Sequence, residues 1–384
     1  MNDAPVIVNR PIDKITNNPI AIYLPGLNGL RSIAALAVVI AHTTMSLDDI
    51  GLSSKIFGTR INGNWRGLDL ATSGVSIFFT LSGFLITFLL LKEKEISQIK
   101  VKDFYIRRLL RIWPLYYLYF AISAVTAIYF GVPYKYELIP FYIFLTANIP
   151  FILGTMLPFV AHYWSLGVEE QFYLFFPHLA KLPNDKLLKT SFIIIVIFLI
   201  IKGFFWVLSK KYNITQPLSI LTVCRFDVML IGVIGAILYY KANDAFLNLS
   251  THKITQLVSW GCILLLAMNK TNFLSVIHEE IVGVITVFLI MGQITRKNYI
   301  INLDNRFCNF IGRISYGIYV VHPLLIFCFC KIIGSYNSPS ISNYLFTYFI
   351  IIAATILIAK ISYEFYEKPF IKLKSKYTII KSSS

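Results

Sequence analysis

Arg31 and His42 lie in the first long apolar stretch of this chain, GLNGLRSIAALAVVIAHTTM. The eleven-residue spacing makes about three helical turns, so both side chains should share one helix face, about 16 Å apart along the axis. An ionisable residue in a membrane helix is energetically costly and by default indicates a functional site. Histidine can also exchange protons near neutral pH. The pair therefore predicts chemistry across a bilayer.

Each of these residues also has a purely structural interpretation. Arg31 could anchor the start of its helix by reaching lipid phosphates. His42 could bond to a backbone carbonyl near the helix end. Because the two side chains are expected on one face, the functional interpretation is favoured.

Two adjacent carboxylates, Glu169 and Glu170, enter an apolar helix in HYWSLGVEEQFYLFFP. Burying both as ions would cost too much, so at least one should be paired, protonated or turned to a water-filled cavity. Arg108 and Arg111 in FYIRRLLRIWPLYYL are three residues apart and should share a face. They could hold phosphate groups through bidentate hydrogen bonds, with anchoring at the cytoplasmic interface as the alternative.

Other polar residues in apolar surroundings favour structural roles. Arg225 and Asp227 in CRFDVMLIG are expected to form an intramembrane charge pair. His322 precedes a proline and is expected to be a core histidine with its hydrogen bonds satisfied. Three residues are expected to be solvated at the edge of an outer loop: His278, Glu279 and Glu280.

Composition defines the elements that must position these groups. The 384 residues are 57% hydrophobic, with a mean hydropathy of +0.68, and the apolar runs are continuous instead of alternating. This predicts an all-α, polytopic transmembrane helix bundle rather than a barrel. Ten spans are expected, at about 27–45, 74–91, 112–131, 165–180, 191–208, 219–240, 255–269, 277–294, 314–333 and 344–366.

Basic residues set the predicted orientation. The most basic loop, KEKEISQIKVKDFYIRRLLR, follows the second span and should be cytoplasmic, which with ten spans puts both termini in the cytoplasm. The formal net charge of +16 gathers in such short loops, so it does not indicate nucleic-acid binding. The five cysteines have neither disulfide nor zinc spacing, and no metal is expected.

The segment 137–160 is apolar but interrupted by prolines. We expect it to be re-entrant or interfacial, with an eleventh span as the alternative. The predicted organisation is a cytoplasmic segment over 1–26, one transmembrane domain over 27–366 and a basic cytoplasmic tail over 367–384.

Six motifs follow one another along almost the whole chain: LNGLRSIAALAVVIAH, GVSIFFTLSGFLIT, FYIRRLLRIWPLYYL, HYWSLGVEEQFYLFFP, IGRISYGIYVVHPLL and FYEKPF. Taken together, they resemble the acyltransferase family 3 membrane proteins, which O-acylate bacterial glycans and other exported molecules. Two positions depart from the family pattern: Asn28 and Ser76 stand where many members have an acid.

The resemblance implies an O-acetyltransferase that takes an acyl group, most often acetyl, from cytoplasmic acyl-CoA. His42 would be the general base or the acyl carrier, with Glu169 or Glu170 assisting it. The donor-binding residues would be Arg31, Ser82, Arg108 and Arg111.

The implied location is the bacterial inner membrane, in contact with its lipids. The implied acceptor is an extracytoplasmic glycan or lipid-linked glycan, reached directly or through a separate extracytoplasmic transferase. A secondary transporter or lipid-linked glycan carrier is the alternative function, because it too would place charges at mid-bilayer. The sequence shows no repeated halves, which disfavours that alternative.

Overall fold

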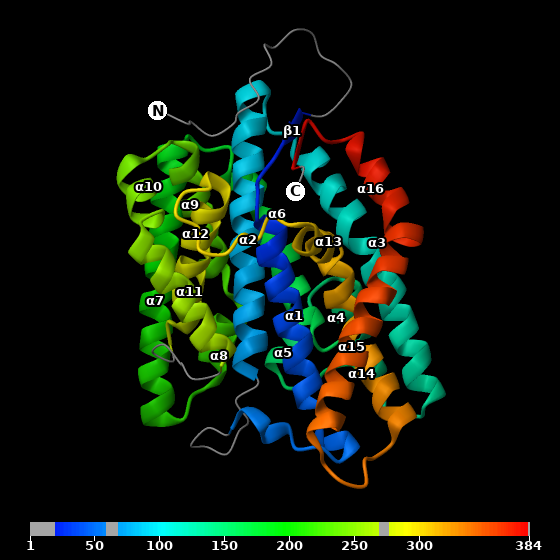
Figure 1. Cartoon of the computed structure of the whole chain (residues 1–384). Helices are drawn as coiled ribbons and strands as arrows, with labels where there is room; N and C mark the ends of the chain where they lie inside the picture. The colour runs from blue at the N-terminus through cyan, green and yellow to red at the C-terminus, as the bar shows by residue number, and fades with distance from the viewer. Residues whose placement is uncertain (1–19, 59–67, 269–275, 383–384) are drawn as a thin grey trace.

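The computed structural model describes residues 20–58, 68–268 and 276–382. Most of the expected cytoplasmic segment 1–26 therefore lies outside the described residues. The described chain forms a helix bundle whose only regular strands are β1 (Ile20–Ile22) and β2 (Ile380–Ser382), paired in parallel (Figure 1). The predicted helical class is confirmed.

One long helix, α2 (Leu68–Ile96), runs through the middle of the bundle (Figure 1). It packs against α1 (Leu27–Met45), α9 (Phe226–Tyr240) and α12 (His278–Thr295), and α1 also contacts α14 (Ser315–Ile333). These helices bury most of their apolar side chains against one another. They form the frame that holds the polar residues of the first and second spans.

Two glycines permit the close approach of α2 and α9. A methyl group at Gly83 would lie 2.0 Å from the carbonyl oxygen of Met229, and one at Gly232 would lie 2.2 Å from that of Thr80. Small residues at a helix interface allow backbones to approach in this way, as is common in membrane bundles.

The outer helices expose large apolar side chains, as a membrane protein requires; examples are Phe192, Ile200 and Phe349. The remaining helices and helical turns are α3 (Val101–Tyr129), α6 (Tyr163–Leu179), α7 (Asn184–Tyr212), α8 (Gln216–Cys224), α10 (Asp244–Ser250), α11 (Lys253–Ala267), α13 (Arg306–Arg313), α15 (Ile341–Ser362), the π-helical turn Tyr363–Glu367, α16 (Lys368–Ser375) and the 3-10 turns Asp48–Ile50, Ser54–Phe57 and Tyr136–Leu138.

Among the described residues, eight helices are long and apolar enough to cross a membrane. One of them is the pair α8–α9, which is interrupted at Arg225, where φ is 42°. Two of the ten predicted spans correspond to the shorter helices α6 and α11, of 17 and 15 residues. The helices thus occur where the apolar pattern predicted them, while the count of ten stays a prediction.

The segment 137–160 forms two short helices, α4 (Ile139–Ile143) and α5 (Asn148–Ile152), instead of one long helix. Tyr142 and Val160 are fully buried, so surrounding protein covers this irregular backbone. Both short helices lie in the half of the bundle away from the strands (Figure 1). This arrangement agrees with the re-entrant interpretation, because irregular backbone at membrane depth requires cover by protein.

Candidate active site

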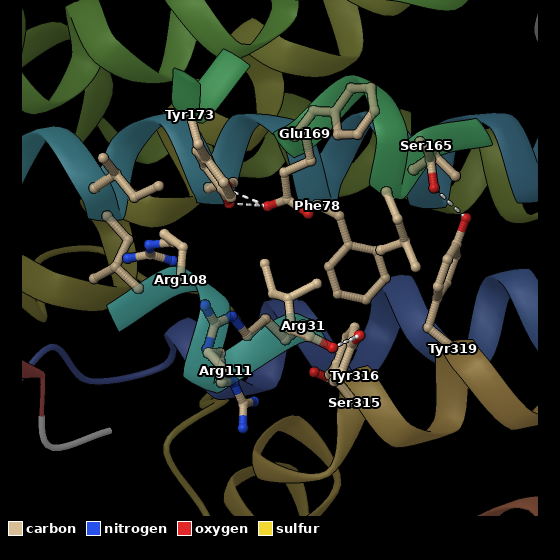
Figure 2. A pocket seen from close by; sticks show the side chains of 17 residues that line it. Arg31, Phe78, Arg108, Arg111, Ser165, Glu169, Tyr173, Ser315, Tyr316 and Tyr319 are labelled. Carbon is tan, nitrogen blue, oxygen red and sulfur yellow. Dashed lines mark hydrogen bonds between the residues drawn. The ribbon is translucent and has the colours of Figure 1, made fainter. Parts of the chain in front are cut away.

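A cavity of about 110 Å³ opens between α1, α2, α3, α6 and α14. Three arginines gather at one end, and Ser165 and Tyr319 lie at the other (Figure 2). Four of the predicted donor-binding residues line it, together with one of the two glutamates: Arg31, Ser82, Arg108, Arg111 and Glu169. The structure therefore brings together residues that are up to 138 positions apart in the sequence.

The arginine end of the cavity carries a net positive charge. The guanidinium of Arg108 lies 5.1 Å from the centre of the Tyr173 ring. Arg111 lies over the ring of Tyr316 and forms a long ion pair of 3.8 Å with Glu367. Within the described residues, neither Arg31 nor Arg108 forms an ion pair. Such a group of guanidinium ions favours an anionic ligand.

Arg107, next to Arg108, has a structural role. It forms a 2.9 Å ion pair with Glu93 and donates a 2.9 Å hydrogen bond to the carbonyl oxygen of Tyr377. Both charged side chains are buried. The hydrogen bond to Tyr377 holds the segment that follows α16 against α3.

Lys374 of α16 lies near the arginine end, within electrostatic range of Arg31, Arg108 and Arg111, because α16 packs against α3. It does not line the cavity. In the sequence Lys374 is one residue of a basic tail, and its single signal is the run KLKSK.

Glu169 is held on the cavity wall by hydroxyl groups. Ser82 donates a 2.6 Å hydrogen bond to Oε1 of Glu169, and the Tyr173 hydroxyl donates to the same oxygen. Ser82 and Tyr173 also contact each other through their hydroxyls. These bonds reduce the cost of placing a carboxylate in this largely buried site.

Glu170 is directed away from the cavity. Its Oε2 accepts a 3.1 Å hydrogen bond from the Trp113 indole, and it does not line the cavity. Consecutive residues of a helix point about 100° apart, so only one of the two glutamates can face the site.

His42 forms a hydrogen bond with His322, the residue expected from the sequence to be a core histidine. Nδ1 of His42 lies 2.9 Å from Nε2 of His322, and the ring centroids are 4.9 Å apart, so the two rings meet edge to edge. The ring of His162 lies 5.2 Å from that of His322. Within the described residues, His42 has no hydrogen bond to Glu169 or Glu170. No direct contact among the described residues therefore supports the expectation that Glu169 or Glu170 assists His42.

Aromatic side chains separate the cavity from the histidines. Phe78 and Tyr319 line the cavity and meet edge to face, with ring centroids 6.0 Å apart. The Tyr319 hydroxyl bonds to Ser165 at 2.5 Å, and its ring lies 5.9 Å from that of His322. His42 itself does not line the cavity. A ligand in the cavity would therefore meet this aromatic pair before it reached His42.

The predicted Arg225–Asp227 pair is wrong, because each residue pairs elsewhere. Arg225 forms a 3.2 Å ion pair with Glu279, and Asp227 lies 2.9 Å from Lys202. Lys202 also contacts Glu280. A lysine that is fully buried on α7 requires carboxylates, and α9 and α12 supply them.

The expected solvation of the residues that begin α12 is also wrong. His278 and Glu280 are 7% and 6% exposed, and Glu279 bonds to Ser76 as well as Arg225. The physical reason is that α12 packs against α2 and α9 from its first turn, so its start lies inside the bundle.

Residues 24–363 match the acyltransferase domain of the acyltransferase 3 family. The chain belongs to this family. It is 29% identical over 372 residues to the "Putative O-acetyltransferase" of Staphylococcus aureus strain COL, with 91% of this chain and 58% of that protein covered. It is 27% identical over 403 residues to "O-acetyltransferase OatA" of Staphylococcus aureus strain NCTC 8325, with 91% and 57% covered.

The chain thus spans less than two thirds of the length of these family members. No solved structure shows a significant match. The site described above is therefore interpreted from its own geometry and from membership of the acyltransferase 3 family.

Proposed function

We propose that this protein is a multi-pass O-acyltransferase of the bacterial inner membrane that moves an acetyl group from cytoplasmic acetyl-CoA to a hydroxyl of an extracytoplasmic glycan. The observation that carries the proposal is the cavity whose cationic end includes Arg31, while His42 follows three turns later on the same helix. Family membership supports acyl transfer as the chemistry.

The donor is assigned to the arginine end. Coenzyme A carries several phosphate charges, and Arg31, Arg108 and Arg111 supply cations for them. Arg31 lies near the start of α1, and α1 begins on the side of the bundle where β1 and β2 pair (Figure 1). With ten spans and both termini in the cytoplasm, the arginine end faces the acyl-CoA pool.

The acetyl group would reach His42 through the aromatic pair of Phe78 and Tyr319. The rise of α1 separates Arg31 from His42 by about 16 Å, a distance that a pantetheine arm can cover. A change of side-chain rotamer at Phe78 or Tyr319 would open the way, since both rings line the cavity and meet edge to face there.

In the transfer step, the acceptor oxygen forms a bond to the acetyl carbonyl carbon and the carbon–sulfur bond breaks. The hydroxyl proton moves to Nε2 of His42 and then to the departing thiolate. His42 as a transient acyl carrier is the alternative, in which its nitrogen is acetylated first and the glycan hydroxyl then takes the acetyl group. Both routes have the same overall products, free coenzyme A and an O-acetyl ester.

The acceptor is assigned to the glycan class through the family. The chain could complete the transfer itself or pass the acetyl group to a separate extracytoplasmic transferase. Membrane lipids surround the exposed apolar helices and could also carry the acceptor as a lipid-linked glycan.

Mass spectrometry of surface glycans tests the proposal. Cells that produce the wild type, His42→Ala or no protein are compared, with membrane levels of both proteins checked by immunoblotting. We expect an added mass of one acetyl group per modified sugar only with the wild type. Identical glycans in all three strains, at equal protein levels, would refute the glycan O-acetyltransferase assignment.

A further inference from the structure

We propose that His322 is a positioning residue that fixes the ring proton of His42 on Nδ1 and so presents Nε2 of His42 as the free base. The catalytic consequence of this arrangement rests on the proposed function. The proton positions themselves do not, and they can be measured separately.

His322 carries a proton on Nδ1. Its Nδ1 lies 3.2 Å from the carbonyl oxygen of Ile318, one helical turn earlier. A carbonyl oxygen only accepts hydrogen bonds, so Nδ1 of His322 must carry a proton.

His322 carries no net charge. The side chain is fully buried, and its ring contacts are His42, His162 and Tyr319. Among the described residues, no carboxylate forms a hydrogen bond or ion pair with it. Burying an unpaired imidazolium would be costly, so His322 is neutral and its Nε2 carries a lone pair.

The state of His322 determines which nitrogen of His42 is protonated. Nε2 of His322 is 2.9 Å from Nδ1 of His42, and one of these two nitrogens must donate. Because Nε2 of His322 has no proton, Nδ1 of His42 is the donor. A neutral His42 then has its lone pair on Nε2, which is the nitrogen that can take a proton from a hydroxyl or attack an acyl carbonyl.

His162 does not compete for this arrangement. Its Nε2 donates a 3.2 Å hydrogen bond to the carbonyl oxygen of Val320. Its Nδ1 has no hydrogen-bond partner among the described residues. His162 therefore packs beside His322 without a hydrogen bond to either histidine. The backbone of Val38, one turn before His42, also interacts with the His42 ring and favours a proton on the side that faces it.

The fold makes the bond a fixed one. His42 and His322 come from α1 and α14, which contact each other directly. The hydrogen bond between the facing ring edges, whose planes are 27° from parallel, restricts rotation of both side chains. When His42 gains a proton on Nε2, its Nδ1 proton can still be donated to His322, so the bond persists through the reaction.

The proton positions are tested by solid-state nitrogen-15 NMR of the full chain, labelled at histidine and reconstituted in liposomes. The signals of His42 are identified by their loss in His42→Gln. We expect a protonated Nδ1 and an unprotonated Nε2 at His42, and a larger share of the form protonated at Nε2 in His322→Leu, where only the Val38 backbone is left to hold the Nδ1 proton. A protonated Nε2 at His42 of the wild type would overturn the inference, whether or not acyl transfer is found.

The functional consequence is tested with three variants at position 322. A glutamine amide oxygen can reach the place of Nε2 and accept the His42 proton, whereas the shorter asparagine and the apolar leucine cannot. We expect kcat for acetyl transfer to fall about 10–100-fold in His322→Leu and His322→Asn, by analogy with lost orienting partners at metal-bound histidines. His322→Gln should stay within about fivefold of the wild type, and the donor KM should change less than twofold in all three, since the donor cations are unaltered.

The exposed His252 supplies a matched control, because His252→Gln alters a histidine on a helix end outside the site. A purely structural role would lower kcat equally in all three variants at position 322, together with their melting temperatures, and would overturn the inference. Absence of acetyl transfer by the wild type would instead refute the proposed function and leave the NMR result to decide the proton positions.

Discussion

Ser82 and Glu169 are joined by a 2.6 Å hydrogen bond that links α2 to α6 across the wall of the cavity. The Tyr173 hydroxyl donates to the same carboxylate oxygen, so one acceptor holds two donors. Glu169 therefore contributes to the site in two ways: its oxygen accepts hydrogen bonds, and its carboxylate carries a negative charge.

Substitutions at Glu169 should divide these effects. Glu169→Gln keeps an oxygen that can accept both bonds, so its stability should remain close to the wild type. Glu169→Ala leaves two hydroxyls without their acceptor and should lower the free energy of unfolding by about 1–3 kcal/mol. Thermal unfolding of the detergent-solubilised variants measures the difference. Equal melting temperatures for the two variants would contradict this account.

The neighbouring arginines 107 and 108 form a matched pair. Arg108→Ala removes a cavity cation and should raise the donor KM at least tenfold, because charge-assisted hydrogen bonds contribute about 1.5–3 kcal/mol. Arg107→Ala should instead destabilise the protein by about 3–5 kcal/mol, since it leaves Glu93 buried without its partner. Donor titrations combined with thermal unfolding distinguish the two. A donor KM unchanged in Arg108→Ala would exclude it from donor binding.

Lys202 offers a test of the buried ion cluster. Lys202→Met leaves Asp227 and Glu280 without their cation and should cost about 3–5 kcal/mol of stability. Adding Asp227→Asn and Glu280→Gln removes the uncompensated charges and should recover part of the loss. The melting temperatures of these variants provide the measurement.

The control for Lys202 is Lys241→Met, whose ion pair with Asp185 is exposed and should contribute little. If Lys202→Met were as stable as Lys241→Met, the buried cluster would not need its cation.

The contact between α2 and α9 predicts a steric effect. Gly83→Ala would push a methyl group against the Met229 carbonyl oxygen and should cost about 1–3 kcal/mol, as overpacking does in protein cores. Gly203→Ala, inside α7, meets no atom within 4 Å and should not lower the melting temperature, because alanine favours the helix more than glycine does. A tolerant Gly83→Ala variant would show that the two helices can separate without loss.

Local patterns predicted part of this site correctly. The spacing of Arg31 and His42 and that of Arg108 and Arg111 are helical periodicities, and each requires only the knowledge that its segment is a helix. The apolar runs supplied that knowledge, because a chain in lipid must satisfy its backbone within helices. The cavity accordingly contains the arginines that the sequence indicated.

Contacts between distant segments could not be obtained in this way. His322 bonds to His42 across 280 residues, and no local period connects them. The sequence could not distinguish Glu170 from Glu169. Packing sets the rotation of α6 about its axis, and this rotation decides which of the two glutamates faces the cavity. Lys202 has two carboxylate partners on other helices, and only its position in the run LIIKGFF marked it as unusual.

The parallel pairing of β1 with β2 has a consequence for biosynthesis. β2 follows α15 and α16 in the chain, so it can pair with β1 only after the ribosome has made the last long helix. The same late segment brings the Tyr377 carbonyl to Arg107 and Lys374 to the arginine end. The cationic end of the cavity is therefore completed only after α16 has been synthesised, well after the helices α1, α2 and α3 that supply its arginines.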